Sequence, residues 1–412
     1  MLPRIMIVVH GHPSISKGGA EITAYNFFKE FKRQGAECLF VAHSAEPSHG
    51  GSAFSVVGDG ELLFHTRMSD FFLFRSAEPS HITHNFRQLL ELFKPDVVHL
   101  HHYVQLGLEM IPEIRRTCPN AKVFVTLHEF LAICHHNGQM VKTETHNLCY
   151  RASPKDCSYC FKDRSPGDFF LRERYIKAIF EDVTAFIAPS NFLKSRYVAW
   201  GLPEDKIHII ENGQPKVERL PPRPLAEGEV RGRFAYFGQI NPYKGVDILL
   251  EAFCLLPNSI RNKVRLDIHG ANLEKQDPEF QKKIRQLLEK LGNSVAWHGP
   301  YEANEMPRLL ADIDWVVIPS IWWENSPLVI QEAYNFGRPV ITANIGGMAE
   351  KNLGSKAETQ FSVRNALSLS QVVVKLVEKY NGKYADSQLV IPNVCLLEET
   401  ARQHLNQYVS PH

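Results

Sequence analysis

Short apolar runs alternate with longer amphipathic stretches along most of the chain. The runs are four to six residues long, which is typical of buried strands, and the stretches between them have the apolar spacing of helices. Strands that alternate with helices form parallel sheets, so the pattern predicts an α/β fold. The predicted strands are Arg4–Val9, Asp96–His99, Lys122–Thr126, Ala185–Ala188, Lys206–Ile210, Arg233–Phe237, Val264–His269, Val295–His298 and Trp315–Pro319.

The chain is too long for one typical hydrophobic core. With 412 residues and 44% hydrophobic content, it suits two domains of roughly 200 residues each. We predict a first domain over 1–215, a proline-containing linker over 216–232, a second domain over 233–393 and a terminal helical segment over 394–412.

Charge and hydropathy exclude several classes of partner. Lys and Arg number 46 against 45 Asp and Glu, so no net field recruits nucleic acid. The apolar run Ile5–Val9 is too short for a signal-peptide core, and no stretch approaches the roughly 20 apolar residues that span a bilayer. We therefore expect a cytoplasmic location.

The stretch from Pro319 to Gly347 holds the strongest candidate site. Its pattern predicts a strand, a loop, a helix that starts at Pro327 with Ser326 as N-cap and ends before Gly337, and a second strand. The helix N-terminus favours an anion such as phosphate. We therefore predict that the loop Asn325, Ser326, Pro327 and Leu328 binds the anion, through the amides of its three residues other than proline.

Two carboxylates lie next to this predicted anion site. Glu324 is in the entry loop and Glu332 is in the second turn of the helix. A carboxylate can hold a vicinal diol, such as that of a ribose or a hexose, so the group suits a nucleotide-sugar pocket. Spacing alone also allows two exposed glutamates on an ordinary surface helix.

The residues around this pair carry a family resemblance. Glu324, seven residues and then Glu332, with Ser-Pro-Leu between them and Gly-Arg-Pro-Val after, resemble the signature of retaining family-4 glycosyltransferases of the GT-B fold. The resemblance implies two Rossmann-like domains that face a central cleft, with the C-terminal helix crossing back to the first. It implies that Glu324 contacts the donor sugar, that Glu332 contacts the ribose, and that transfer needs no metal.

The resemblance also implies partners and a reaction. A sugar moves from a nucleoside diphosphate donor to a hydroxyl of a glycan or lipid-linked acceptor, with retention, in bacterial polysaccharide or lipid-linked glycan synthesis. Two other functions stay open: a glycoside hydrolase that uses the two glutamates, and a noncatalytic protein that binds nucleotide sugars. The base is expected to stack near Trp297–Tyr301.

In each predicted domain, one glycine-containing loop follows the first strand. Gly18 and Gly19 precede a helix, and the resemblance implies that they face the donor diphosphate; a tight turn explains them equally well. Lys244 precedes a helix in the second domain, where it can bind the diphosphate as a catalytic cation. Gln239 stands where the family usually has Arg, so one phosphate cation is missing.

Histidines follow several strands. The resemblance places His128 in the acceptor pocket beside the reacting centre, and His10 is a weaker acceptor-binding candidate. His99, His101 and His102 also follow or end a strand, and we expect structural roles for them.

An insertion over 129–163 contains four of the eight cysteines. Cys134, Cys149, Cys157 and Cys160 supply the ligand count of a tetrahedral structural zinc, with His135, His136 and His146 as alternative ligands. Small buried thiols in a long lid are the alternative.

Two further patterns suggest roles that we weigh against a structural one. The helix from Ser165 to Glu181 has arginines beside aromatic residues, which suits peripheral contact with the inner face of a membrane. We favour a helix that packs on its own sheet with its arginines solvated. Asp312 and Asp314 are expected to be structural and not to bind metal.

Overall fold

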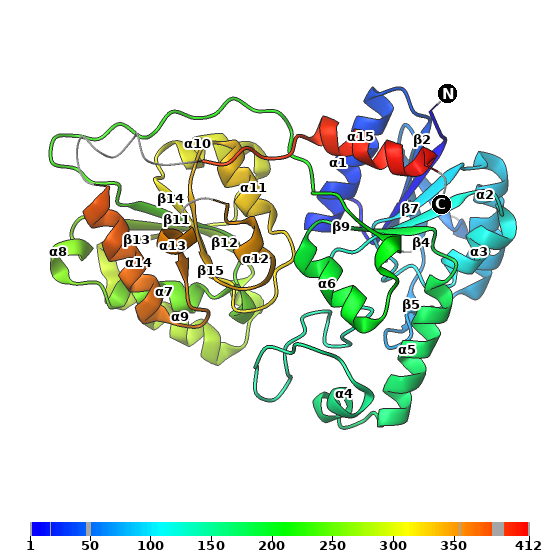
Figure 1. Ribbon diagram of the computed structural model, residues 1–412, viewed down its shortest axis with the longest axis horizontal. Helices are drawn as coiled ribbons and strands as arrows, with labels where there is room; N and C mark the ends of the chain where they lie inside the picture. Colours follow the sequence, from blue (N-terminus) through cyan, green and yellow to red (C-terminus); the bar gives the residue numbers. More distant parts are fainter. Residues whose placement is uncertain (1, 17, 47–50, 354–355, 381–390, 411–412) are drawn as a thin grey trace. The chain divides into compact units, whose positions relative to one another are not determined.

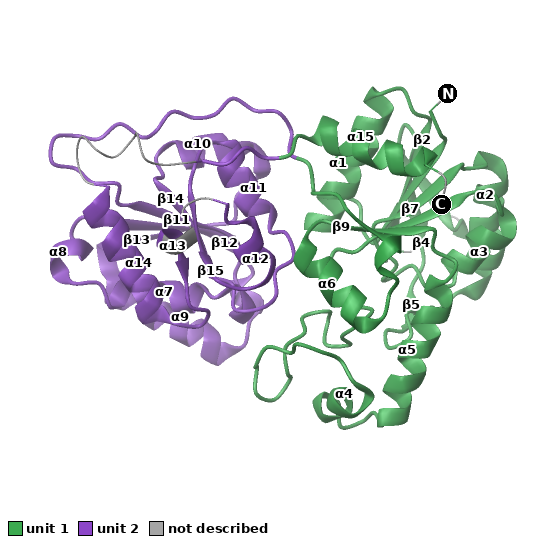
Figure 2. Ribbon diagram, in the orientation of Figure 1, with its two compact units in different colours: residues 1–213, 395–412 green, residues 214–394 purple. Residues whose placement is uncertain are grey.

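The protein folds into two compact units, each built around a parallel sheet (Figures 1 and 2). The computed structural model describes residues 1–412 except 1, 17, 47–50, 354–355, 381–390 and 411–412, and parts of the predicted ranges 1–215, 233–393 and 394–412 therefore lie outside the described residues. Unit 1 comprises Met1–Gly213 with Cys395–His412, and unit 2 comprises Gln214–Val394. No helix in the described part of the chain is long and apolar enough to cross a membrane.

Unit 1 contains an eight-stranded sheet in the order β10-β9-β8-β7-β1-β2-β4-β3. Its strands are parallel except β3, which pairs antiparallel with β4 at one edge. The strands are β1 Ile5–Val9, β2 Cys38–Ser44, β3 Phe54–Gly58, β4 Glu61–His65, β7 Val97–Leu100, β8 Lys122–Thr126, β9 Ala185–Ala188 and β10 Ile207–Ile209, and a separate hairpin joins β5 Met68–Asp70 to β6 Arg75–Ser76.

The helices of unit 1 form two groups. Alternate residues of β1, Ile5, Ile7 and Val9, belong to the core beneath α1 and α15, which contact each other. Helices α2, α3 and α5 form a second group of neighbouring helices (Figure 1). The helices are α1 Gly19–Arg33, α2 Arg87–Phe93, α3 Met110–Thr117, α4 Pro154–Cys160, α5 Pro166–Phe180, α6 Asn191–Trp200 and α15 Leu397–Val409, with a π-helix over His81–Phe86.

The C-terminal helix α15 packs on unit 1 although it follows unit 2 in the chain. Tyr408 of α15 places its hydroxyl 2.5 Å from Nδ1 of His99 on β7, and Lys122 of β8 donates to the carbonyl of Tyr408 at 2.9 Å. The other ring nitrogen of His99 lies 2.7 Å from Thr126 Oγ1. His99 is therefore a structural residue that fixes α15 to the sheet.

Unit 2 contains a six-stranded parallel sheet in the order β13-β12-β11-β14-β15-β16. The strands are β11 Arg233–Gln239, β12 Arg265–Ala271, β13 Val295–Gly299, β14 Trp315–Ile318, β15 Val340–Ala343 and β16 Gln360–Phe361. The helices are α7 Val246–Cys254, α8 Asn258–Arg261, α9 Pro278–Leu291, α10 Met306–Ala311, α11 Leu328–Asn335, α12 Gly346–Lys351, α13 Lys356–Thr359 and α14 Ala366–Lys379. Helices α7, α9 and α14 pack together beside the sheet (Figure 1).

The segment predicted as a linker is attached firmly to unit 2. Arg223 and Arg231 are buried, and each guanidinium binds the carboxylate of Asp314, at 3.0 and 2.9 Å. Asp314 is thus neutralised by two arginines, which agrees with its predicted structural role.

The α/β fold class with two Rossmann-like sheets is as predicted. In both units the strand order reverses next to the first strand: β1 lies between β2 and β7, and β11 lies between β12 and β14. Open α/β sheets bind ligands outside the carboxyl ends of the strands at such a reversal. Each unit therefore has one topologically favoured binding position.

Candidate functional site

The loops after β11 and β14 meet at the reversal point of the unit 2 sheet. Gly245 has a φ of +69°, and a Cβ there would collide with the carbonyl of Pro319, so only glycine allows this approach. The amide of Ile321 donates to the carbonyl of Tyr243 at 2.9 Å. These contacts hold the two loops side by side.

This approach brings Lys244 and Glu324 together from positions far apart in the sequence. Lys244 Nζ lies 2.6 Å from Glu324 Oε1. Both side chains are at least partly shielded from water, with 27% and 10% of their side-chain surfaces exposed. The contact joins a cation and a carboxylate that sequence analysis assigned separately to the diphosphate and the donor sugar.

One oxygen of Glu324 receives all of the side-chain contacts that the carboxylate makes among the described residues. Ser320 Oγ donates to Oε1 at 2.8 Å and Trp322 Nε1 donates at 2.9 Å, in addition to Lys244. Oε2 is thereby left to accept hydrogen bonds from a ligand. Sequence analysis did not identify Ser320 or Trp322, although both lie within four residues of Glu324.

Glu332 occupies a very different environment. Burial raises the pKa of its carboxyl group to about 7, and among the described residues no side chain or amide forms a hydrogen bond with that group. It lies near Tyr301, whose pKa is raised by burial and then by the charge of Glu332. Tyr301 belongs to the segment predicted to contact the base. An enclosed carboxyl group with free acceptor oxygens suits a diol of a bound ligand.

The helix that carries Glu332 starts one residue later than predicted. Helix α11 begins at Leu328 with Pro327 as its N-cap, and no side chain caps it. The prediction that Ser326 is the cap is wrong, because its hydroxyl accepts a hydrogen bond from Gln331 Nε2 at 2.9 Å. The predicted end is correct to within a residue, since Gly337 follows with a φ of +79°.

The loop before α11 is supported from the next strand connection. Gly347, which follows β15, donates its amide to the carbonyl of Glu324 at 2.8 Å, and a Cβ at Gly347 would collide with the carbonyl of Asn325. Asn325 is buried, while Ser326, Pro327 and Leu328 are half-buried. The loop therefore has one fixed shape around the N-terminus of α11.

Gln239 lies at the end of β11 with an exposed side chain, and its carbonyl accepts a hydrogen bond from the Tyr236 hydroxyl at 2.6 Å.

Three aromatic rings stack across the neighbouring strands β11, β12 and β13. Phe237 and His269 have centroids 4.9 Å apart, and His269 and His298 have centroids 4.4 Å apart. The ring of His298, next to Trp297, ends this stack.

The Gly18-Gly19 loop of unit 1 is covered by a carboxylate. Helix α1 begins at Gly19, and a Cβ at Gly18 would collide with Oε2 of Glu21. Glu21 is buried and accepts a hydrogen bond from Ser16 Oγ at 2.9 Å. A diphosphate at this loop would have to displace that carboxylate, while Lys17 lies outside the described residues.

Four histidines gather at the carboxyl ends of β1, β7 and β8. The rings of His10 and His102 have centroids 4.2 Å apart, and His101 Nδ1 lies 3.2 Å from His128 Nε2. Burial lowers the pKa of His128 to about 3, so the imidazole is neutral at physiological pH. Glu129 follows directly, and its carboxylate lies 3.4 Å from His102 Nε2. Sequence analysis missed Glu129, although it adjoins His128 at a strand end.

The four cysteines of the insertion line one small cavity of about 20 Å³. His135 and His136 also line it. Burial raises the pKa of Cys134 to about 12. Within the described ranges, no three His, Cys, Asp or Glu side chains are arranged to hold a metal ion. The structural zinc therefore stays a prediction from the cysteine spacing.

Helix α5 packs on its own unit. We expected its arginines to be solvated, but one of them is not. Arg172 is buried and donates to the carbonyls of Phe72, Leu131 and Ala132 at 2.9, 2.6 and 2.6 Å. Ser165 caps the helix by a capping box with Asp168. Arg172 thus anchors the start of the cysteine insertion to α5.

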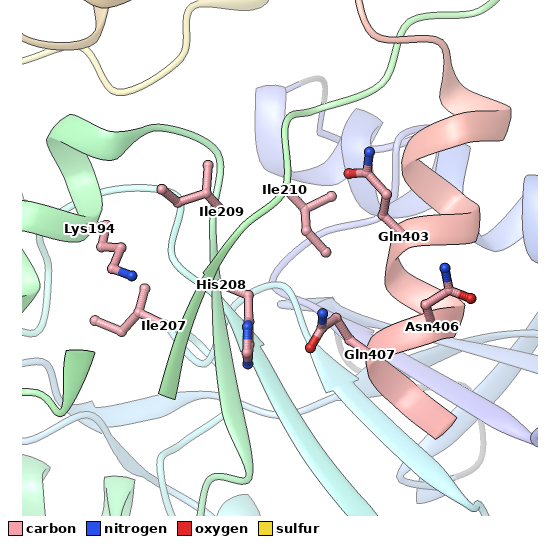
Figure 3. Close-up of a pocket in the computed structure, with 8 residues that line it drawn as sticks. All are labelled: Lys194, Ile207, His208, Ile209, Ile210, Gln403, Asn406 and Gln407. Atoms are coloured by element: carbon pink, nitrogen blue, oxygen red, sulfur yellow. The ribbon is translucent and has the colours of Figure 1, made fainter. Parts of the chain in front are cut away.

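A separate cavity of about 470 Å³ lies beside the edge strand β10, as Figure 3 shows. Its lining consists of aliphatic, amide and basic side chains from α6, β10, the residue after β10, and α15: Lys194, Ile207, His208, Ile209, Ile210, Gln403, Asn406 and Gln407. No carboxylate lines it, and none of the predicted site residues does.

Comparisons with known families match both units. The family model described as "Glycosyl transferases group 1" matches residues 231–379, and the model described as "Glycosyltransferase Family 4" matches residues 17–214. The first match includes Lys244, Glu324 and Glu332, and the second includes His128 and Glu129.

Curated relatives share part of the chain. Over 173 residues it is 30% identical to the lipopolysaccharide 1,2-N-acetylglucosaminetransferase of Salmonella typhimurium. This aligned region covers 40% of this chain and 45% of the relative. Over 156 residues it is 31% identical to the lipopolysaccharide glucosyltransferase WaaG of Escherichia coli K12, covering 35% and 39%. The matches thus span less than half of these relatives.

Among solved structures, the chain resembles Anabaena Alr3699/HepE in complex with UDP. The TM-score is 0.61 at 16% sequence identity, with 98% of this chain and 95% of that chain covered. At this identity the likeness establishes the fold, and it extends over both units.

Proposed function

Because the chain belongs to the group 1, family 4 glycosyltransferases of GT-B fold, we propose that it transfers a sugar from a nucleoside diphosphate sugar to a glycan hydroxyl with retention of configuration. Unit 2 binds the donor and unit 1 contributes the acceptor-side groups. The observation that carries the proposal is the contact of Lys244 with Glu324 at the reversal point of the unit 2 sheet.

Each donor group has a binding partner in unit 2. Lys244 and the N-terminus of α11 supply positive charge for the diphosphate, which must accept charge as the sugar departs. Oε2 of Glu324 faces no protein donor among the described residues and binds a hydroxyl of the transferred sugar. Glu332, beside Tyr301, binds the ribose diol. Uridine is the proposed base, because the structural relative from Anabaena binds UDP.

Lys244 compensates for the absence of an arginine at Gln239. A diphosphate that enters the site meets an ammonium that is already held by Glu324, so its position is fixed before binding. The neutral side chain of Gln239 is exposed and can donate a hydrogen bond to a phosphate oxygen. The remaining charge stabilisation comes from the amides of the α11 N-terminus.

The acceptor is proposed to be a glycan of the cell envelope. Two curated relatives act on lipopolysaccharide, as their names state. The proposed acceptor is accordingly an oligosaccharide, free or linked to lipid, and peripheral contact with the inner face of the cytoplasmic membrane is part of this proposal.

The proposal is tested with nucleotide sugars and their nucleotides. Thermal unfolding is measured with a panel of nucleoside diphosphates and their sugars, because a ligand at 100 times its Kd stabilises by about 2.7 kcal/mol. We expect stabilisation by UDP, and UDP release from a UDP-sugar that rises when an oligosaccharide acceptor is added. Cleavage of aryl glycosides without nucleotide would favour a hydrolase, and tight donor binding with no turnover on any acceptor would favour a noncatalytic binding protein.

A further inference from the structure

Three strand ends meet at the reversal point of the unit 1 sheet. β1 ends before His10, β7 before His101 and His102, and β8 shortly before His128 and Glu129. β1 lies between β2 and β7, so a ligand of unit 1 is expected at these ends. The residues there include one carboxylate that follows the predicted catalytic histidine directly.

The tautomer of His102 is fixed by its backbone neighbours. Its Nδ1 accepts hydrogen bonds from the amides of Tyr103 and Val104, both at 3.1 Å. In a neutral imidazole the other nitrogen then carries the hydrogen. Nε2 lies 3.4 Å from Glu129 Oε1, so the protonated ring nitrogen is next to the Glu129 carboxyl group.

Glu129 is held from its other oxygen as well. Oε2 accepts a hydrogen bond from the amide of Leu131, and Arg172 binds the carbonyl of Leu131 at 2.6 Å. The backbone at Gly138 packs so closely on this oxygen that a Cβ there would collide with it. About a quarter of the Glu129 side-chain surface nevertheless remains exposed. The carboxyl group is therefore fixed in place and still accessible to a ligand.

We propose that Glu129 is the acceptor-binding group of unit 1: its Oε1 accepts a hydrogen bond from the sugar hydroxyl that becomes glycosylated, while the ring of His102 lies beside the same oxygen and limits its position. The proposal rests on the glycosyltransferase function proposed above, and it assigns the acceptor's reacting hydroxyl to a named atom. His102 acts through Glu129 and is a positioning residue.

His128 suits this task less well than Glu129. One of its ring nitrogens lies 3.2 Å from His101 Nδ1, and the ring is buried enough to stay neutral. Burial raises the pKa of Glu129 to about 8, against the opposing charge of Arg172 on α5. His102, just after β7, lies beside this carboxyl group, the charge of Glu129 acts on Tyr103, and the Tyr197 hydroxyl donates to the backbone carbonyl of Glu129 at 2.9 Å. Ionisation just above neutral pH strengthens its hydrogen bond to a hydroxyl.

The test separates acceptor transfer from donor turnover. Purified full-length protein is given UDP-glucose or UDP-N-acetylglucosamine, with water alone or with deacylated lipopolysaccharide core oligosaccharides as acceptors, and UDP release and product are measured. In Glu129→Gln we expect UDP affinity and hydrolysis by water to stay within about twofold of wild type. Transfer to the oligosaccharide should fall at least about 100-fold in kcat/KM, as expected when an interaction made only with the acceptor is lost.

Two controls distinguish this role from a structural one. Glu109→Gln removes another unit 1 carboxyl group whose pKa is raised by burial and which accepts the amide of Ser76, and it should leave the ratio of transfer to hydrolysis unchanged. The wild-type transfer rate should rise with pH towards about 8, and Glu129→Gln should abolish that rise, whereas Glu129→Asp should retain one. Equal losses of hydrolysis and transfer, or no loss of transfer, would overturn the proposal. No UDP release by the wild type from any nucleotide sugar would instead overturn the proposed function, and this inference with it.

Discussion

Replacing Glu332 by glutamine should make the unliganded protein more stable and the nucleotide complex weaker. Burial raises the pKa of Glu332 from 4.5 to about 7, and among the described residues no protein group forms a hydrogen bond with the carboxyl that would offset this cost. The folded protein therefore binds this proton more tightly than the unfolded chain does. The contribution of Glu332 to stability is therefore complete below pH 4.5 and is lost as pH rises from about 4.5 to 7, where the folded carboxyl ionises.

The size of the effect follows from the shift. A change of about 2.5 pKa units corresponds to roughly 3.4 kcal/mol at 1.36 kcal/mol per unit, and the partial exposure of Glu332 reduces our expectation to about 2 kcal/mol. Glu332→Gln should gain this amount at pH 8 and nothing at pH 4.5. For a unit of this size that is a rise in Tm of roughly 4–8 °C.

Binding should change in the opposite direction. Glutamine keeps the shape of the side chain and loses the charged two-oxygen acceptor, so UDP affinity should fall by roughly 1–3 kcal/mol. Wild-type affinity should also rise by about tenfold per pH unit below pH 7, because a diol binds the ionised carboxylate more tightly. The nucleotide's own phosphate ionises near pH 6, and titration of Glu332→Gln under the same conditions subtracts that contribution.

Thermal unfolding and isothermal titration calorimetry at pH 5 to 8 measure both effects. Glu289→Gln is the matched control, since Glu289 is an exposed glutamate on α9 of the same unit and should change neither stability nor affinity. A Glu332→Gln variant that is less stable than wild type at pH 8 would show that the carboxylate has a stabilising partner. Unchanged UDP affinity would refute its role at the ribose.

Three further predictions follow from individual contacts. Lys244→Ala should weaken UDP binding by roughly 1.5–3 kcal/mol, whereas Glu324→Gln, whose amide oxygen can still accept a hydrogen bond from Lys244, should leave UDP affinity unchanged and should lose turnover at least about 100-fold. Calorimetry and UDP release measure the two effects, and equal losses of UDP affinity would contradict the assignment. Burial lowers the pKa of His404 to about 4, so its stabilising contribution is complete above pH 6.5 and is lost as pH falls towards 4. In denaturant titrations between these pH values, the free energy of unfolding of His404→Phe should fall by about 1.4 kcal/mol per pH unit less than that of wild type. Parallel slopes of the two proteins would refute this. Elemental analysis should find one zinc per chain that is lost in the double variant Cys157→Ser with Cys160→Ser, and less than about 0.1 zinc in pure wild type would remove that site.

Elements defined by local signals were predicted almost to the residue. Lys122–Thr126 and Ala185–Ala188 are strands as predicted, and α11 ends just before Gly337 as predicted. A run of apolar residues and a glycine after a helix act within a few residues, so sequence alone identifies them.

Side-chain partners outside the local helix and strand signals were not predicted. The hydroxyl of Ser326 binds Gln331 and does not cap α11. Arg172 is buried because the carbonyls of Phe72, Leu131 and Ala132 converge on it from up to 100 residues away. The contact between Lys244 and Glu324 joins residues 80 positions apart. None of these partners has a sequence spacing that identifies it.

A raised carboxyl pKa does not by itself mark a functional residue in this chain. Burial raises the pKa of Glu109 too, but its carboxyl accepts a hydrogen bond from the amide of Ser76, and it lies at the start of α3. Asp314 shows the structural alternative, in which two arginines neutralise a buried carboxylate. Glu129 and Glu332 differ in their surroundings: Glu129 lies three residues after the end of β8, next to His102, and Glu332 lies on α11, directly after the loop that holds Glu324. Folding places a costly group there in each unit, and a bound hydroxyl is the partner that offsets that cost.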